Sequence, residues 1–251
     1  MSLTCVVRLL EHMVNSHMNN YAEEHKILFR DQHGFRRNRS CERQLLELVC
    51  DIAKRLDEGR ETDACVLDFS KAFDKVNHSK LLLKLANYGV SPQIVSWIDS
   101  FLSQRLHKVV IEDAESMASH VSAGVPQGSV IGPALFLFYI NDLPDSAKSR
   151  VGLLADNTII YSNASSPACL QHKWDMKFHP KTCDDIVFTR NRNQTTNEYK
   201  LHDTCIPKYS CIKYLGIHVN SKLSWNKQGH KTSAKANSTL GFVHQNVITT
   251  S

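Results

Sequence analysis

The spacing of hydrophobic positions predicts several helices. Apolar side chains recur at helical intervals over residues 45–56, with Ser40 as a suitable N-cap and Gly59 as a suitable C-cap. A loop rich in Gly and Pro over residues 122–131 precedes a continuous apolar run, which is typical of a buried helix. The remaining predicted helices are the buried one at 133–140 and three others at 6–18, 81–88 and 94–102.

Other segments have the pattern of strands. Residues 64–69 are nearly all apolar, which favours a strand buried on both faces and makes the carboxylate of Asp68 costly unless a cation meets it. Short apolar runs on both sides of Asp156 and Asn157 predict a β-hairpin with these two residues at its turn. Further strands are predicted at 186–189 and 214–219, a polar loop at 190–198 and a polar segment after Trp225.

Composition narrows the class of protein without identifying it. The 251 residues are 42% hydrophobic and 22% charged, as in globular rather than disordered proteins, and the net charge of +5 favours polyanionic partners only slightly. No run is long enough for a membrane span, and the start lacks a secretory pattern, so we expect no membrane association. Eight cysteines form no C-x-x-C pair, so we expect a reduced intracellular protein, cytoplasmic or nuclear, without structural zinc or a disulfide-linked partner.

Asp68 and Asp156 are candidates for chemistry because each accompanies an apolar run. Phosphoryl transfer to a nucleotide uses two divalent cations about 3.5–4 Å apart, held by carboxylates from separate strands. Magnesium accepts a few carboxylates together with substrate phosphates, so two or three acids at strand ends suffice. Taken singly, each residue fits a surface aspartate or an ordinary turn better, and the pair alone leaves that alternative open.

A series of motifs in one order favours a metal site over an ordinary surface aspartate or turn. The motifs are QHGFRRNRS at 32–40, LDFSKAFD at 67–74, GVPQGSVIGP at 124–133, YINDL at 139–143, LADN at 154–157, residues 174–183 and YLGI at 214–217. Together they resemble the reverse transcriptase domain of non-LTR retrotransposons, specifically the jockey-like elements, over about residues 2–225. The resemblance implies an α+β fold with a right-hand polymerase palm, an antiparallel sheet backed by helices, partial fingers and no thumb.

The same resemblance implies a domain organisation and a function. The expected domains are partial fingers at 1–61, a palm at 62–225 with a fingers-type helical insertion at about 79–122, and a polar tail or start of a missing thumb connection at 226–251. The implied activity is RNA-directed DNA polymerase, a two-metal nucleotidyl transfer from a dNTP to a primer 3′-hydroxyl. The implied partners are an RNA template, a DNA primer and dNTPs, and the implied cofactors are two Mg²⁺ or Mn²⁺ ions.

Roles follow from the resemblance residue by residue. Asp68 and Asp156 would ligate metal, with the backbone carbonyl of Phe69 as an extra oxygen. Phe73 would exclude a ribose 2′-hydroxyl and so select deoxynucleotides; the alternative is a core aromatic. The expected nucleotide contacts are Gln127, Gly128 and Arg36. A plain Gly-Pro turn at 127–128 and a solvated surface charge at Arg36 are the alternatives.

The chain also departs from the family pattern. Asn157 stands where the family has a second catalytic aspartate, and one lost charge at about 4 Å from a divalent ion is worth on the order of several kcal/mol. Lys181 is the candidate proton donor, one place early, and residues 171–173 stand where the family has an extra helix. We therefore expect a truncated, degenerate copy with impaired activity. The alternatives are that Asn157 is tolerated, that the chain is an inactive nucleic-acid-binding remnant, or that it folds poorly.

Overall fold

Segments far apart in the sequence form a four-stranded antiparallel sheet with the order β6-β7-β1-β8. The computed structural model describes residues 3–69, 71–103, 105–112, 114–147, 149–161, 178, 182–190, 199–201 and 204–247. The strands of the sheet are β1 (Thr62–Asp68), β6 (Arg150–Leu154), β7 (Asn157–Tyr161) and β8 (Asp184–Phe188). Two small hairpins, β9–β10 and β11–β12, follow it; their strands are Lys200–Leu201, Thr204–Cys205, Cys211–Tyr214 and Ile217–Asn220.

The predicted helices are confirmed. The side chain of Ser40 caps α2 by accepting a hydrogen bond from the backbone N–H of Arg43 at 3.2 Å. The first helix is longer than predicted, because Met18 and Ala22 near its end are also buried. The helices are α1 (Leu3–Glu24), α2 (Cys41–Asp57), α3 (His78–Asn87), α4 (Pro92–Leu102), α5 (Gly132–Ile140) and α7 (Asn226–Val247), with short 3₁₀ turns at Phe73–Lys75 and Pro144–Ser146.

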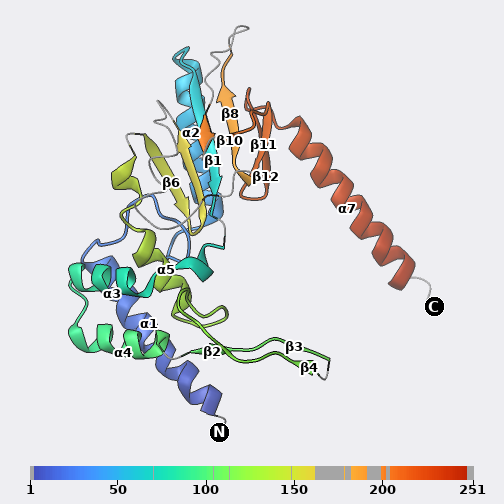
Figure 1. Cartoon of the computed structure of the whole chain (residues 1–251). Coiled ribbons are helices and arrows are strands. Elements are labelled where there is room, and N and C mark those ends of the chain that lie inside the picture. The colour runs from blue at the N-terminus through green and yellow to red at the C-terminus, as the bar shows by residue number, and fades with distance from the viewer. Residues whose placement is uncertain are drawn as a thin grey trace.

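Alternate side chains of the sheet enter two hydrophobic clusters. The larger cluster contains α5, and its sheet members include Cys65, Leu67, Val151, Leu153 and Ile160. The second cluster contains α2 and the β11–β12 hairpin, and its sheet members include Ala64, Val66, Ile159, Tyr161, Ile186 and Phe188. Both faces of β1 are therefore covered, as its continuous apolar sequence predicts. In Figure 1, α2 runs along the sheet.

Two hairpin predictions need correction. Leu154 pairs with Asn157, so the β6–β7 turn consists of Ala155 and Asp156, one residue earlier than predicted. The pairing of β7 with β1 determines this register, and the local sequence of the turn does not reveal it. The single strand predicted at 214–219 is a hairpin, in which Leu215 (φ 46°) and Gly216 (φ 84°) form the turn. Positive φ at both positions is typical of a type I′ turn.

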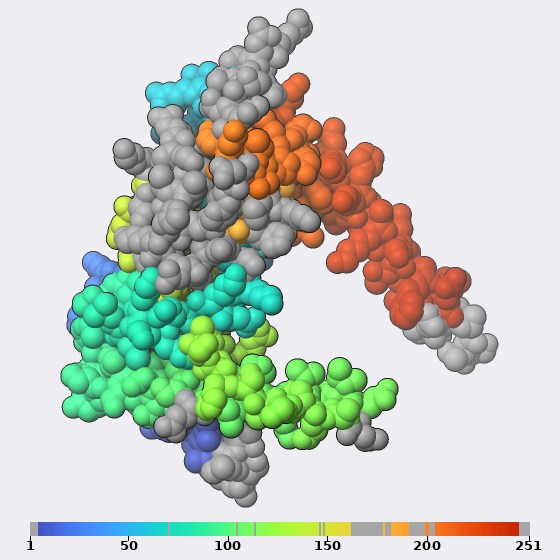
Figure 2. Space-filling view, viewed as in Figure 1, coloured from blue at the N-terminus to red at the C-terminus, as the bar shows by residue number. Residues whose placement is uncertain are grey.

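Two elements project from the body on the same side of the molecule (Figures 1 and 2). The first is an exposed ribbon in which β2 (Leu106–His107) pairs with β5 (Ser119–His120) and β3 (Val110–Ile111) pairs with β4 (Ala114–Glu115). The helical insertion predicted over 79–122 is thus helical only as far as Leu102. The second projection is α7, a 22-residue helix in the segment predicted to be a polar tail or the start of a missing thumb connection.

Several expectations lie outside the described residues. These are the connection at 171–173, most of the segment 174–183, and the loop 190–198 except Arg190. The described cysteines are all unpaired. None of the helices in the described ranges combines the length and the hydrophobicity needed to cross a membrane.

Asp185 on β8 generates a pH-dependent prediction. The side chain is buried and accepts a hydrogen bond from the Cys65 thiol at 3.6 Å. Burial raises the pKa of Asp185 from 3.8 to about 6. Because the folded state holds the proton more tightly than the unfolded state, stability declines as pH rises from about 4 to about 6. We expect Asp185→Asn to remove this decline, so that its advantage over the parent grows across that window in urea unfolding.

The control is Asp57→Asn, which removes the same charge from an exposed position at the end of α2. A constant stability difference between Asp185→Asn and the parent from pH 4 to pH 7 would contradict the assignment.

Candidate active site

Asp68, Asp156 and Asn157 come together at one end of the sheet. Asp68 is the last residue of β1 and pairs with Asn157, the first residue of β7. Directly opposite residues of an antiparallel pair point to the same face, so these side chains are neighbours. Asp156 precedes Asn157 in the turn, and its Oδ1 accepts a hydrogen bond from the amide nitrogen of Asn157 at 3.4 Å. The fold therefore unites carboxylates that are distant in sequence.

The electrostatics of Asp156 reflect this arrangement. Burial raises the pKa of Asp156, and the negative charge of Asp68 raises it further, although a backbone hydrogen bond opposes the increase. Loss of solvation and like-charge repulsion both disfavour the ionised pair, and a cation between the carboxylates relieves both. Carboxylate oxygens with the carbonyl of Phe69 are the ligand types that Mg²⁺ and Mn²⁺ prefer. In the described ranges no group of three or more His, Cys, Asp or Glu side chains is placed so that it could hold a metal ion.

A short segment of the QHGFR motif fixes the turn that carries Asp156. Gln32 lies beside Leu153 in a parallel bridge, and its buried side-chain oxygen accepts hydrogen bonds from the backbone N–H groups of Gly34 at 2.8 Å and Ala155 at 3.1 Å. A Cβ atom at Gly34 would lie 2.4 Å from the nitrogen of Ala155. Ala155 has φ 54°, a strained value that these contacts hold in place. No role was predicted for Gln32 or Gly34, although both belong to the QHGFR motif.

Phe73, the predicted steric gate, belongs to an aromatic row. Its ring stacks on Phe136 of α5 with centroids 4.4 Å apart, and Phe35 meets it edge-on at 6.3 Å. The core therefore fixes one side of the Phe73 ring. Phe35 is exposed and has φ 52°, which is unusual for an aromatic residue. Sequence reasoning did not single out Phe35, although it lies in the same motif as Gln32.

Gln127 and Gly128 lie in the loop between the ribbon and α5. The amide nitrogen of Gln127 donates to Oδ1 of Asp74 at 2.9 Å, so this loop contacts the turn that carries Phe73. Gly124 in the same loop has φ 89°, and a Cβ there would lie 2.7 Å from the carbonyl oxygen of Asp74. Gly128 has φ 82° with open space at its Cβ position. Gly124 thus lets the loop approach the backbone of Asp74 closely, whereas Gly128 leaves open space beside the loop.

The side chain of Arg36 lies in a network of hydrogen bonds within the protein. Its Nε and Nη2 donate to the carboxylate of Glu23 at 2.8 and 2.7 Å, and Nη1 donates to the carbonyl oxygens of Phe29 and Gln32 at 2.8 and 3.3 Å. The side chain is only 8% exposed, and the pair lowers the pKa of Glu23. Arg36 therefore ties the motif to α1, so the alternative of a solvated surface charge is wrong, whereas the triphosphate contact stays a prediction.

The candidate proton donor cannot be placed near these groups. Lys181 lies outside the described residues. Cys183, from the same motif, is buried beside the backbone of Asp68, and burial raises the pKa of its thiol to about 11. This thiol is therefore neutral near pH 7.

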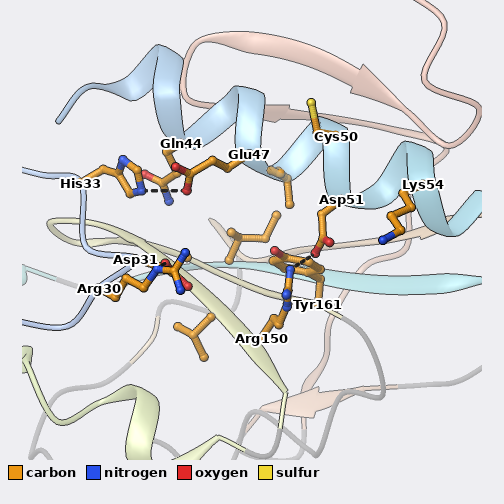
Figure 3. Close-up of a pocket in the computed structure, with 14 residues that line it drawn as sticks. Arg30, Asp31, His33, Gln44, Glu47, Cys50, Asp51, Lys54, Arg150 and Tyr161 are labelled. Atoms are coloured by element: carbon orange, nitrogen blue, oxygen red, sulfur yellow. Dashed lines mark hydrogen bonds and ion pairs between the residues drawn. The ribbon is translucent and has the colours of Figure 1, made fainter.

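A cavity of about 450 Å³ lies between α2 and strands β6 and β7 (Figure 3). Three acids and three cations line it, of which Arg150 pairs with Asp51. The buried His33 ring places Nε2 3.3 Å from the carboxylate of Glu47. Burial lowers the pKa of His33 despite that carboxylate, so the ring is neutral. Neither Asp68 nor Asp156 lines this cavity, and we assign its charged groups to the packing of α2 on the sheet.

The chain belongs to the reverse transcriptase (RNA-dependent DNA polymerase) family, whose model matches residues 1–219. Two similar proteins of Drosophila melanogaster are the probable RNA-directed DNA polymerase from transposon BS and the RNA-directed DNA polymerase from mobile element jockey. They are 27% and 26% identical, over 89% and 88% of this chain. The chain spans 27% and 26% of their lengths.

Solved structures agree with the fold. Telomerase from Candida tropicalis, in complex with a TWJ fragment of telomeric RNA, superposes with a TM-score of 0.59 at 11% identity over 86% of this chain and 36% of that one. The corresponding telomerase complex from Candida albicans gives a TM-score of 0.56 at 12% identity over 88% and 37%. The predicted mixed helix-and-sheet polymerase fold is thereby confirmed at this level of detail.

The role of Gln32 is testable by unfolding. Gln32→Ala leaves two buried backbone N–H groups without an acceptor, each costing about 1–3 kcal/mol. We expect the free energy of unfolding to fall by about 2 kcal/mol or more in urea, with Gln93→Ala on the exposed surface of α4 as the control. A loss no larger than that of the control would show that the turn does not depend on this contact.

Proposed function

We propose that this chain is the palm, with part of the fingers, of an RNA-directed DNA polymerase. The observation that carries this proposal is the pairing of Asp68 with Asn157, which puts Asp156 beside Asp68 in a chain of the reverse transcriptase family. In this assignment the sheet is the palm, α5 backs it, and the α1 region with the QHGFR motif supplies fingers residues.

The chain's own residues have distinct tasks in the proposed reaction. Asp68 and Asp156, with the carbonyl of Phe69, would hold two divalent ions, which supply activation of the primer 3′-hydroxyl and neutralisation of the leaving pyrophosphate. Phe73 would exclude a 2′-hydroxyl by contact with the sugar. Gln127 and the space beside Gly128 would receive the incoming nucleotide. The contacts of Gln32 would keep Asp156 in position before substrate binds.

The two projections support nucleic acid as the partner. Helix α7 contains no Asp or Glu, and Lys227, Lys231 and Lys235 recur at intervals of four, so they share one face. A row of ammonium groups suits a phosphate backbone. Both α7 and the ribbon extend from the same side of the body (Figure 2), where an RNA template and a DNA primer would lie between them.

Asn157 is the weak point of the proposed site. Its position opposite Asp68 puts an amide where a third negative charge would otherwise face the metal ions. One lost charge is worth on the order of several kcal/mol, and each 1.4 kcal/mol is about tenfold in rate. We therefore propose an impaired polymerase rather than a fully active one.

A second candidate function is nucleic-acid binding without catalysis. It is favoured by Asn157 together with the intact fold, because a folded, basic chain can bind primer-template even where metal binding is too weak for chemistry. Such a protein would bind primer-template in a salt-dependent manner and extend nothing.

Primer extension separates the two functions. With an RNA template, a DNA primer and Mg²⁺ or Mn²⁺, we expect weak extension by the parent chain and a gain of at least about tenfold in Asn157→Asp, since the substitution restores one charge at the metal site. Asp68→Ala in either background should abolish extension.

Asp57→Asn is the matched control for charge changes. Asp57 is the last residue of α2, where it pairs with Arg190 and not with the residues of the candidate site. If Asn157→Asp binds primer-template yet extends nothing, the catalytic proposal fails and the binding function stands.

The gate role of Phe73 is tested in the Asn157→Asp background. Phe73→Val opens space beside the sugar, so incorporation of ribonucleotides relative to deoxynucleotides should rise by about tenfold or more. Phe101→Val, which removes a ring from the Trp97 stack on α4, controls for general loosening. Equal selectivity in Phe73→Val and its background would contradict the gate assignment.

A further inference from the structure

Glu11 is a buried acid of α1 that belongs to none of the motifs. Its residue is only 5% exposed. Its Oε2 atom accepts a hydrogen bond from the backbone N–H of Val130 at 2.7 Å and a longer one from that of Ile131 at 3.5 Å. A buried carboxylate is costly unless hydrogen bonds satisfy it, so these two contacts fix the position of the side chain.

The two N–H groups lie at the start of α5. Ile131 occupies the N-cap position of this helix, and its apolar side chain cannot accept a hydrogen bond. The first turn of α5 contains no acidic residue either. In a capping box, a glutamate of the helix itself binds the N-cap N–H, and negative charge near a helix N-terminus is stabilising. Glu11 supplies both from another helix, since α1 packs beside α5 (Figure 1).

The segment that Glu11 holds also holds Phe73. The backbone N–H of Val125 donates to the carbonyl oxygen of Phe73 at 2.8 Å. The ring of Phe73 stacks on that of Phe136 with centroids 4.4 Å apart. The backbone and the ring of Phe73 therefore both contact the segment 125–136, and Glu11 binds this segment at Val130, between the two contacts.

The other end of α5 is tied to the same part of the chain. Asn141 follows the last residue of α5. Its side chain accepts a hydrogen bond from the backbone N–H of Phe29 at 2.7 Å and donates to the carbonyl oxygen of Ile27 at 2.8 Å. Ile27 and Phe29 lie shortly after the end of α1. A movement of α5 along its axis would therefore break hydrogen bonds at both of its ends.

We propose that Glu11 is a positioning residue, whose bond to the start of α5 fixes the Phe73 ring where that ring excludes a ribose 2′-hydroxyl. Glu11 acts through the segment 125–136 rather than on the substrate. The part of the proposal that concerns sugar selection rests on the proposed polymerase function. The placement of the ring depends on the fold alone, so it can be measured without activity.

The first experiment measures the environment of the Phe73 ring by fluorine NMR of the full chain. Para-fluorophenylalanine replaces Phe73 in one sample and Phe101 in another, where the ring stacks on Trp97 of α4. Each sample is prepared in the parent chain, in Glu11→Ala and in Glu11→Gln. Glu24→Ala, which removes an exposed acid at the end of the same helix, is the matched control.

We expect Glu11→Ala to shift or broaden the signal from position 73 and to leave the signal from position 101 in place. Glu11→Gln keeps an acceptor oxygen at the same point of the side chain, so it should retain both parent signals. If thermal unfolding shows that Glu11→Ala is not folded, Glu11→Asp takes its place, because its acceptor is withdrawn by one methylene while the charge remains.

Three spectral outcomes would overturn the proposal. The first is a signal from position 73 that is the same in Glu11→Ala as in Glu24→Ala. The second is an equal change at positions 73 and 101, which would indicate general loosening of the core. The third is a change in Glu11→Gln as large as that in Glu11→Ala, since the hydrogen-bond acceptor would then have no part in placing the ring.

The second experiment measures sugar selection in the Asn157→Asp background. We expect Glu11→Ala to raise incorporation of ribonucleotides relative to deoxynucleotides by about threefold or more, and Glu11→Gln to leave the ratio unchanged. When Phe73→Val is also present, Glu11→Ala should not change the ratio further, because the ring through which Glu11 acts has been removed.

A folded Glu11→Ala chain that extends primers with an unchanged ratio would overturn the role in sugar selection. A chain that extends nothing in the Asn157→Asp background contradicts the polymerase function instead. The fluorine spectra then still support or overturn the placement of the ring by Glu11, so the two failures are distinguishable.

Discussion

The register between β1 and β7 is the constraint on which the candidate site depends. Backbone hydrogen bonds place Asp68 opposite Asn157, and the turn then brings Asp156 alongside. A slip of one residue would turn the β7 side chains to the other face of the sheet and separate these groups. Hydrophobic burial on both faces of β1 prevents the slip, because Ala64 and Leu67 belong to different clusters. Apolar packing therefore holds Asp68 and Asp156 close together, although burial removes part of the solvation of Asp156.

Local signals predicted the parts of the fold that local energetics determine. The hydroxyl of Ser40 caps α2. The run at 133–140 is apolar on all sides, and it forms the buried helix α5. Non-local contacts decided the rest. The turn at Asp156 moved by one residue because β1, distant in sequence, determines the register of β7. Leu215 occupies a turn position where Asn would have been the recognisable signal, so the β11–β12 hairpin was missed.

The same distinction applies to the candidate site residues. The motifs indicated Asp68, Asp156, Phe73 and Gln127 as members of one region, and the fold gives each a neighbour from another motif. Arg36 could not be placed from the sequence, since its partner Glu23 lies in a separate helix with no motif of its own. The contribution of Gln32 was equally hidden, because a side chain that accepts two backbone hydrogen bonds leaves no compositional signal.

Helix α7 extends away from the body (Figure 1), and its described side chains are exposed along nearly the whole length. Most of the stability of a protein helix comes from packing of an apolar face, and Leu240, Phe242 and Val243 of this helix are exposed. The stability of α7 as a helix then depends on a partner that packs against it rather than on the sheet. Backbone amides of α7 should exchange with solvent long before those of β1, and a bound polyanion would slow that exchange in α7 while leaving β1 as it was.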